Sequence, residues 1–150
     1  MSKFIYRMQN ILNVKYKLED QAKTEFMLAN QVLREEEEKL QGLEDRKKGY
    51  EETVRQLLKS HLQVDRIKEN QEAVRRMEEF IKAQKIRVEE AARQVEIKAA
   101  KLTELMQERK AQEKLKEKAF EVFLQEENAR ESKEIDELVS FTYVRNQREE

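Results

Sequence analysis

The sequence predicts an all-α protein, an antiparallel two-helix coiled-coil hairpin whose C-terminal helix is the longer one. The chain of 150 residues contains no proline and only two glycines, the residues that most often interrupt helices. Charged residues make up 42% of it, which is typical of long solvated helices. Apolar residues recur every seven positions, the spacing at which one helix buries a narrow stripe against another. The clearest run is Val74, Ile81, Val88, Val95 and Leu102.

The first helix is expected over about residues 3–58. Its apolar stripe begins with Phe4, Ile11 and Leu18, then shifts by about one residue and resumes as Phe26, Leu33 and Leu40. Leu43, Tyr50 and Leu57 form a second row. Such a shift is typical of a coiled coil, because a real helix does not match the seven-residue repeat perfectly.

A turn is expected at about residues 59–63. A single helix of 150 residues would be ~225 Å long, whereas a hairpin buries its apolar stripe within one molecule. Ser60 is predicted to cap the second helix, with Gln63 three residues later at capping-box spacing. The alternative turn is Glu69-Asn70. His61 is interpreted as a solvated turn residue, since a lone histidine is a poor metal site.

The second helix is expected over about residues 64–146, so that residues 1–150 form one coiled-coil domain. With this turn, residue 3 lies opposite about residue 119, and residues 120–150 run past the amino terminus. The apolar stripe nearly disappears between Met106 and Leu115 and then returns. The overhanging apolar residues are therefore expected to pair with, or insert into, another chain.

The residues argue against an enzyme. There is no cysteine and one histidine, so no catalytic, cofactor-binding or metal-binding set is expected. The acidic run 35–38 points around the whole helix and is interpreted as solvated, with Glu36 the one member placed to enter the seam. Gly42 and Gly49 are isolated within a helical pattern and make no phosphate-binding loop.

Charge and hydropathy limit which partners and which cell compartment are expected for this chain. The net charge is −1 without a basic stripe, which argues against nucleic acid. The opening MSKFIYRMQN lacks the features of a signal peptide, and no apolar run approaches the ~20 residues of a membrane span. A soluble cytoplasmic protein is expected. Lys3 and Arg7 beside apolar residues leave a membrane-surface helix as a lesser alternative.

Three segments resemble the flagellar FliJ family. The run FIYRMQNILNVKYKLE (residues 4–19) is similar to the opening of these proteins, and so is EFMLA (25–29) with Leu40, Leu43 and Tyr50 after it. The sequence SKEIDEL (132–138) is similar to their closing acidic motif. The resemblance implies an antiparallel two-helix coiled coil in the flagellar type III export apparatus, in the cytoplasm and peripheral to the inner membrane at the flagellar base.

The resemblance also implies partners and surfaces. It implies binding to the hexameric export ATPase, whose assembly the protein promotes, contact with the cytoplasmic domain of the export gate, and an escort role for substrate-specific export chaperones. By this analogy the ATPase-facing surface consists of Phe4, Met8, Ile11, Val122, Phe123 and Ile135. The gate-facing surface consists of Leu43, Tyr50, Met77, Phe80 and Gln84. The alternative for Tyr50, Met77 and Phe80 is that they simply close the seam.

Two other functions fit the same pattern. One is the equivalent stalk protein of a virulence type III secretion system. The other is a homodimeric coiled-coil scaffold in which each chain is one long helix, continuous through Ser60.

Overall fold

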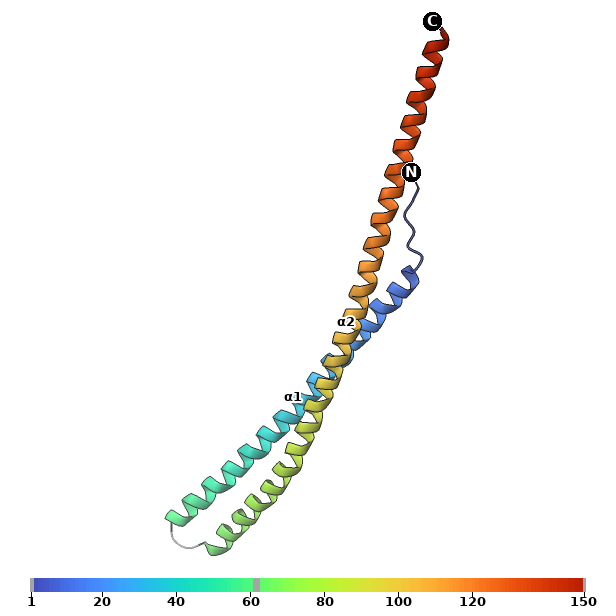
Figure 1. The fold of residues 1–150 in the computed structure, drawn as a ribbon. Coiled ribbons are helices and arrows are strands. Elements are labelled where there is room, and N and C mark those ends of the chain that lie inside the picture. Colours follow the sequence, from blue (N-terminus) through green and yellow to red (C-terminus); the bar gives the residue numbers. More distant parts are fainter. Residues whose placement is uncertain (1, 61–62, 150) are drawn as a thin grey trace. The chain divides into compact units, whose positions relative to one another are not determined.

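The computed structural model describes residues 2–60 and 63–149 and contains two α-helices in that part of the chain (Figure 1). Helix α1 spans Gln9–Lys59 and helix α2 spans Val64–Glu149, 51 and 86 residues respectively. The two helices pack antiparallel, and the second is the longer. The predicted fold class is therefore confirmed.

The start of α1 differs from the prediction. Residues 2–8 are not helical, and α1 begins at Gln9 rather than at residue 3. Extended backbone covers about twice the distance per residue that a helix covers. The non-helical segment therefore carries Phe4 and Ser2 farther along α2 than another helical turn would. At the other end, α2 continues to Glu149 rather than stopping at about 146.

The predicted cap at Ser60 is wrong. Its hydroxyl donates to the carbonyl oxygen of Gln56 at 3.4 Å, so Ser60 completes α1 instead of starting α2. Helix α2 begins four residues later at Val64, after Gln63, whose carbonyl accepts the first helical bond from Ile67. His61 and Leu62, on which the rest of the predicted turn falls, lie outside the described residues.

Two alternatives for the chain path are also wrong. Glu69 and Asn70 lie inside α2, where the Asn70 amide donates to the carbonyl of Arg66 at 2.8 Å. The single long helix of the scaffold alternative is excluded because Ser60 is not helical and a new helix begins at Val64.

The chain forms two compact units, which are described separately. The terminal unit contains residues 2–19 and 105–149, and the hairpin unit contains 20–60 and 63–104. Whether the whole chain acts as one domain stays a prediction.

The core of the hairpin unit is narrow and contains small residues. Its buried apolar side chains are Ala22, Ala73, Met77, Ile81 and Ala91. The row of Val74, Ile81, Val88, Val95 and Leu102 is half-buried apart from Ile81, which is buried. In the row three residues on, Met77, Gln84 and Ala91 are buried, whereas Lys98 and Leu105 are half-buried. The charged faces are consequently left to solvent, as the composition predicts.

The terminal unit has one fully buried large side chain, Leu12, which is 1% exposed. Residues 2–8 follow α2 as far as Glu127, whose carboxylate accepts a hydrogen bond from the Ser2 hydroxyl. Arg130 also donates to that hydroxyl, at 3.3 Å. Every described residue from 128 onward is exposed. The predicted overhang is present, but it begins later than residue 120 because the extended N-terminal segment covers the first part.

Candidate functional site

The first candidate surface is built around three phenylalanines of the terminal unit. The Phe4 ring centroid lies 5.2 Å from that of Phe120, edge to face, and 5.4 Å from that of Phe123. Phe120 and Phe123 lie one helical turn apart on α2, with their rings 6.4 Å apart. Aromatic pairs at these separations attract each other beyond the burial of their area. The cluster fixes the non-helical N-terminal segment onto α2.

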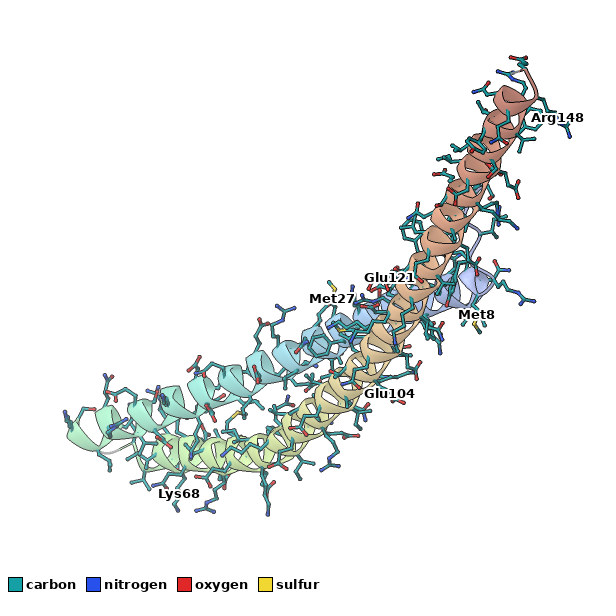
Figure 2. All side chains as sticks on the ribbon, turned by 45° about the horizontal axis from the view of Figure 1, so that its top comes forward. Met8, Met27, Lys68, Glu104, Glu121 and Arg148 are labelled. Carbon is teal, nitrogen blue, oxygen red and sulfur yellow. The ribbon has the colours of Figure 1, made fainter. Side chains whose placement is uncertain are left out.

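A shallow apolar groove of about 490 Å³ lies beside this cluster. Its walls come from the N-terminal segment and from one face of α2: Lys3, Phe4, Ile5, Tyr6, Arg7, Met8, Ala119, Val122, Phe123 and Glu126. Ile5 is 77% exposed and Val122 is 52% exposed, so the apolar wall faces solvent. Met8, the residue before α1, is also exposed (Figure 2).

The groove brings together four of the six predicted ATPase-facing residues: Phe4, Met8, Val122 and Phe123. Ile11 is exposed on α1 outside the groove wall, and Ile135 is exposed farther along α2. Ile5 is the most exposed apolar residue here, and it is not among the predicted contacts. Its place in the groove depends on the non-helical course of residues 2–8, which the unbroken apolar periodicity does not indicate.

A polar network around the buried Glu19 lies in the seam of the terminal unit, where the apolar stripe of the sequence fades. Arg109 donates to the Glu19 carboxylate through Nε at 2.6 Å and Nη2 at 3.2 Å, and to Glu113 through Nη1 at 3.1 Å. Tyr16 donates to the other oxygen of Glu113 at 2.5 Å. Lys15 pairs with Glu108 at 3.0 Å. Polar side chains therefore replace apolar ones as the contact between α1 and α2.

The network shifts the pKa values of its members. The hydrogen bond from Tyr16 lowers the pKa of Glu113 below its ordinary value, and the nearby Arg109 charge acts in the same direction. The same hydrogen bond raises the pKa of Tyr16. Both shifts favour the protonated phenol and the ionised carboxylate, the pair that the geometry needs. The fading stripe between Met106 and Leu115 is the signal in the sequence that could have located this network.

The predicted gate-facing residues divide into a buried and an accessible set. Met77 and Gln84 are 8% and 4% exposed and lie between the two helices of the hairpin unit. Leu43 and Tyr50 are half-buried, and Phe80 is 54% exposed. Of the five, Phe80 is thus the residue most available to a partner.

Glu36 enters the seam, as its place in the sequence predicts. The Gln84 amide donates to the backbone carbonyl of Glu36 at 2.9 Å and also to its carboxylate. This hydrogen bond lowers the pKa of Glu36. Gln84 therefore holds the two arms of the hairpin unit together, and its amide is occupied within the chain.

A second groove, of about 510 Å³, lies between the two arms of the hairpin unit. Ala29 and Ala91 leave it open because their side chains are small, and Leu28 and Val32 form an exposed apolar wall. The rim is charged with both signs, and Lys98 pairs across it with Glu25 at 3.3 Å.

Two features of the described residues bear on other functions. No described helix is both long and apolar enough to cross a membrane. Within residues 2–60 and 63–149, no group of three or more His, Cys, Asp or Glu side chains is arranged to hold a metal ion.

Comparison with protein families identifies the chain. The family described as "Flagellar FliJ protein" matches residues 3–148. No curated protein and no solved structure gives a significant match. The family match spans nearly the whole chain, so both units are included, and it confirms the resemblance seen in the three segments of the sequence. The chain therefore belongs to the flagellar FliJ family, whose members are non-enzymatic coiled-coil components of the flagellar export apparatus.

Proposed function

We propose that this chain binds the hexameric export ATPase through its terminal unit, promotes assembly of the hexamer and links it to the export gate. Family membership supports a place in the export apparatus. The observation that favours the terminal unit as the ATPase-binding part is its exposed apolar groove. Along α2 the groove is followed by residues 128–149, which are all exposed. We place the protein in the cytoplasm, at the inner face of the membrane beside the apparatus.

The proposed ATPase-facing surface has the layout of a protein interface. Phe4, Met8, Val122 and Phe123 give it an apolar centre, and Lys3, Arg7 and Glu126 give it a charged rim. Interfaces of this kind gain most of their binding energy from a few central aromatic and apolar residues. Ile11 and Ile135 extend the apolar area on α1 and α2 respectively.

The proposed effect on the ATPase is one of mass action. A protein that contacts several subunits of the ring binds the hexamer more tightly than the monomer, and this shifts the ATPase toward the hexamer. No reacting group is required of this chain.

The gate-facing surface is proposed on the hairpin unit. Phe80 supplies an exposed aromatic contact, with Leu43 and Tyr50 half-exposed. Met77 and Gln84 are assigned a supporting role, since they are buried between the helices that carry the other three. Escort of substrate-specific export chaperones is proposed as an additional role, for which family membership is the support. A virulence-system stalk is the alternative, and neighbouring genes would separate the two.

The test is co-elution of the full chain with purified flagellar export ATPase, followed by assays of hexamer formation and ATP hydrolysis. Val122→Glu places a charge in the groove and should abolish binding and stimulation. Val64→Glu is the matched control, because Val64 is equally exposed (50% against 52%) but belongs to the hairpin unit. Absence of binding by the folded wild-type chain, or equal loss in both variants, would contradict the proposal.

A further inference from the structure

The last part of α2 carries apolar side chains that have no partner in the terminal unit. Residues 131–149, here called the overhang, are all exposed and lie beyond Arg130, which donates a hydrogen bond to Ser2 of the N-terminal segment. Figure 2 shows their side chains pointing away from the helix, up to Arg148, with no other segment of this unit beside them. Six large apolar residues are exposed here: Ile135, Leu138, Val139, Phe141, Tyr143 and Val144.

One stripe along the overhang has an ordered sequence of charges. Its members follow one another at alternating intervals of three and four residues, so they lie on one face of the helix. They are Glu131, Glu134, Leu138, Phe141, Arg145 and Arg148. The stripe is thus acidic at its start, apolar in the middle and basic at its end. Within residues 2–60 and 63–149, none of these four charges takes part in an ion pair.

We propose that the overhang is a self-recognition surface, through which two copies of this chain pair antiparallel about a two-fold axis. With the axis between Val139 and Ser140, Leu138 of each copy lies opposite Phe141 of the other. Glu134 then faces Arg145, and Glu131 faces Arg148. Because the interface is two-fold symmetric, each of these contacts occurs twice.

The charges select this orientation over the parallel one. In a parallel pair, each side chain of the stripe would face its own copy, so glutamate would face glutamate and arginine would face arginine at four positions. Like charges opposite each other are destabilising, whereas the antiparallel pair converts the same four positions into attractive contacts. Charge complementarity along one stripe is therefore the argument for a second copy as the partner.

The length of the stripe limits the strength of the dimer. An 18-residue contact, ~27 Å long, with apolar layers only at its centre belongs with small, reversible interfaces. Exposed ion pairs contribute little affinity, so Leu138 and Phe141 hold the dimer and the charges set its orientation. This inference does not depend on ATPase binding, because the dimer is expected to form in the purified full chain without the ATPase present.

The first test is sedimentation equilibrium of the full chain from about 1 to about 300 µM, a range suited to micromolar dissociation constants. The expected result is a monomer at the lower end and a dimer at the upper end. Phe141→Glu should leave a monomer throughout. Tyr143→Glu is the control: Tyr143 is equally exposed (64% against 68%) but lies on the opposite face of the helix, so the dimer should persist. A wild-type chain that stays monomeric, or a dimer that survives Phe141→Glu, overturns the proposal.

The second test addresses orientation. Glu134→Arg and Arg145→Glu should each weaken the dimer by about tenfold or more, because each creates like-charged contacts twice. The double variant Glu134→Arg/Arg145→Glu should restore it, since the pairs re-form with their signs exchanged. Asp136→Arg makes the same charge change on the opposite face and should have little effect. Single variants without effect, or a double variant that fails to recover, rule out the antiparallel arrangement. Helical content measured by circular dichroism verifies that each variant folds.

Discussion

The guanidinium of Arg109 donates two hydrogen bonds to the carboxylate of Glu19, which is 3% exposed and lies 90 residues earlier in the chain. The pair sits in the seam of the terminal unit, between α1 and α2. A charged pair in the seam contributes little net stability compared with apolar residues, but an alignment that separates the two partners leaves a buried charge uncompensated. We therefore interpret Glu19 and Arg109 as the residues that fix the register of this unit.

Replacing Glu19 with alanine should lower the melting temperature by several degrees, because Arg109 loses both hydrogen bonds to Glu19 and keeps the one to Glu113. Glu19→Leu combined with Arg109→Leu should recover most of the loss, since an apolar pair can replace a buried ion pair. Thermal unfolding followed by circular dichroism measures both. If the double variant were less stable than Glu19→Ala alone, the pair would be stabilising the unit rather than setting its register.

Acid should remove the contribution that the hydrogen bond between Tyr16 and Glu113 makes to the stability of the folded chain. The hydrogen bond from Tyr16 lowers the folded-state pKa of Glu113 below the ordinary value of 4.5. A lowered carboxylate pKa adds stability that is present above the unfolded-state pKa and is lost as pH falls through the folded-state value. Tyr16→Phe should therefore reduce the melting temperature at pH 7 and make a smaller difference below about pH 4. A difference that is the same at both pH values would contradict this linkage.

The two glycines of α1 offer a gain in stability. A Cβ atom at Gly42 or Gly49 would meet no atom within 4 Å apart from the neighbouring residues and backbone of α1, so alanine fits at both positions. Each Gly→Ala change should stabilise the protein by about 0.5–1 kcal/mol, because glycine loses more backbone entropy on forming a helix. Urea titration of the single variants gives the values. Destabilisation at Gly49 would indicate that this part of α1 depends on glycine for a reason other than space.

The seven-residue periodicity predicted paired long helices, and the turn expected at about residues 59–63 made the pair a hairpin within one chain. The expected turn placed residue 3 opposite about residue 119, next to the position at which Phe4 contacts Phe120. The periodicity did not indicate which of the two rows on α2 is more deeply buried between the helices. Met77, Gln84 and Ala91 look mixed in the sequence, yet all three are buried, and the polar Gln84 bonds to Glu36 of the other arm.

The candidate site was predictable only in part, for reasons of backbone conformation. The apolar stripe continues through Phe4, so periodicity extends the helix to the amino terminus. The contacts of Phe4 with Phe120 and Phe123 instead favour an extended segment, which adds Ile5 to the groove. The hydrogen-bond partner of Glu19 likewise depends on the register of α1 against α2, which the residue pattern within one helix does not determine.

Adjacent residues on α1 should separate stability from binding. Leu12 is 1% exposed, and Leu12→Ala should destabilise the protein by about 2–5 kcal/mol, the cost of a lost core side chain and its cavity. Ile11 is 41% exposed, so Ile11→Ala should change stability by about 0.5 kcal/mol or less while weakening binding to the export ATPase. Urea titration and co-elution give the two readouts. If Ile11→Ala bound as the wild type does, Ile11 would be removed from the proposed surface.

The hairpin unit allows the same separation for the export gate. Phe80→Ala should leave the urea midpoint nearly unchanged, because the side chain is 54% exposed, but it should weaken binding to the purified cytoplasmic domain of the gate. Met77→Ala should do the reverse: it removes a side chain that is 8% exposed and should cost about 2–3 kcal/mol, with gate binding retained wherever the chain is folded. Isothermal titration at a temperature well below both unfolding transitions keeps the two effects apart. Gate binding that is insensitive to Phe80→Ala, yet lost in folded Met77→Ala, would move the contact from the exposed face of α2 to the seam between the helices.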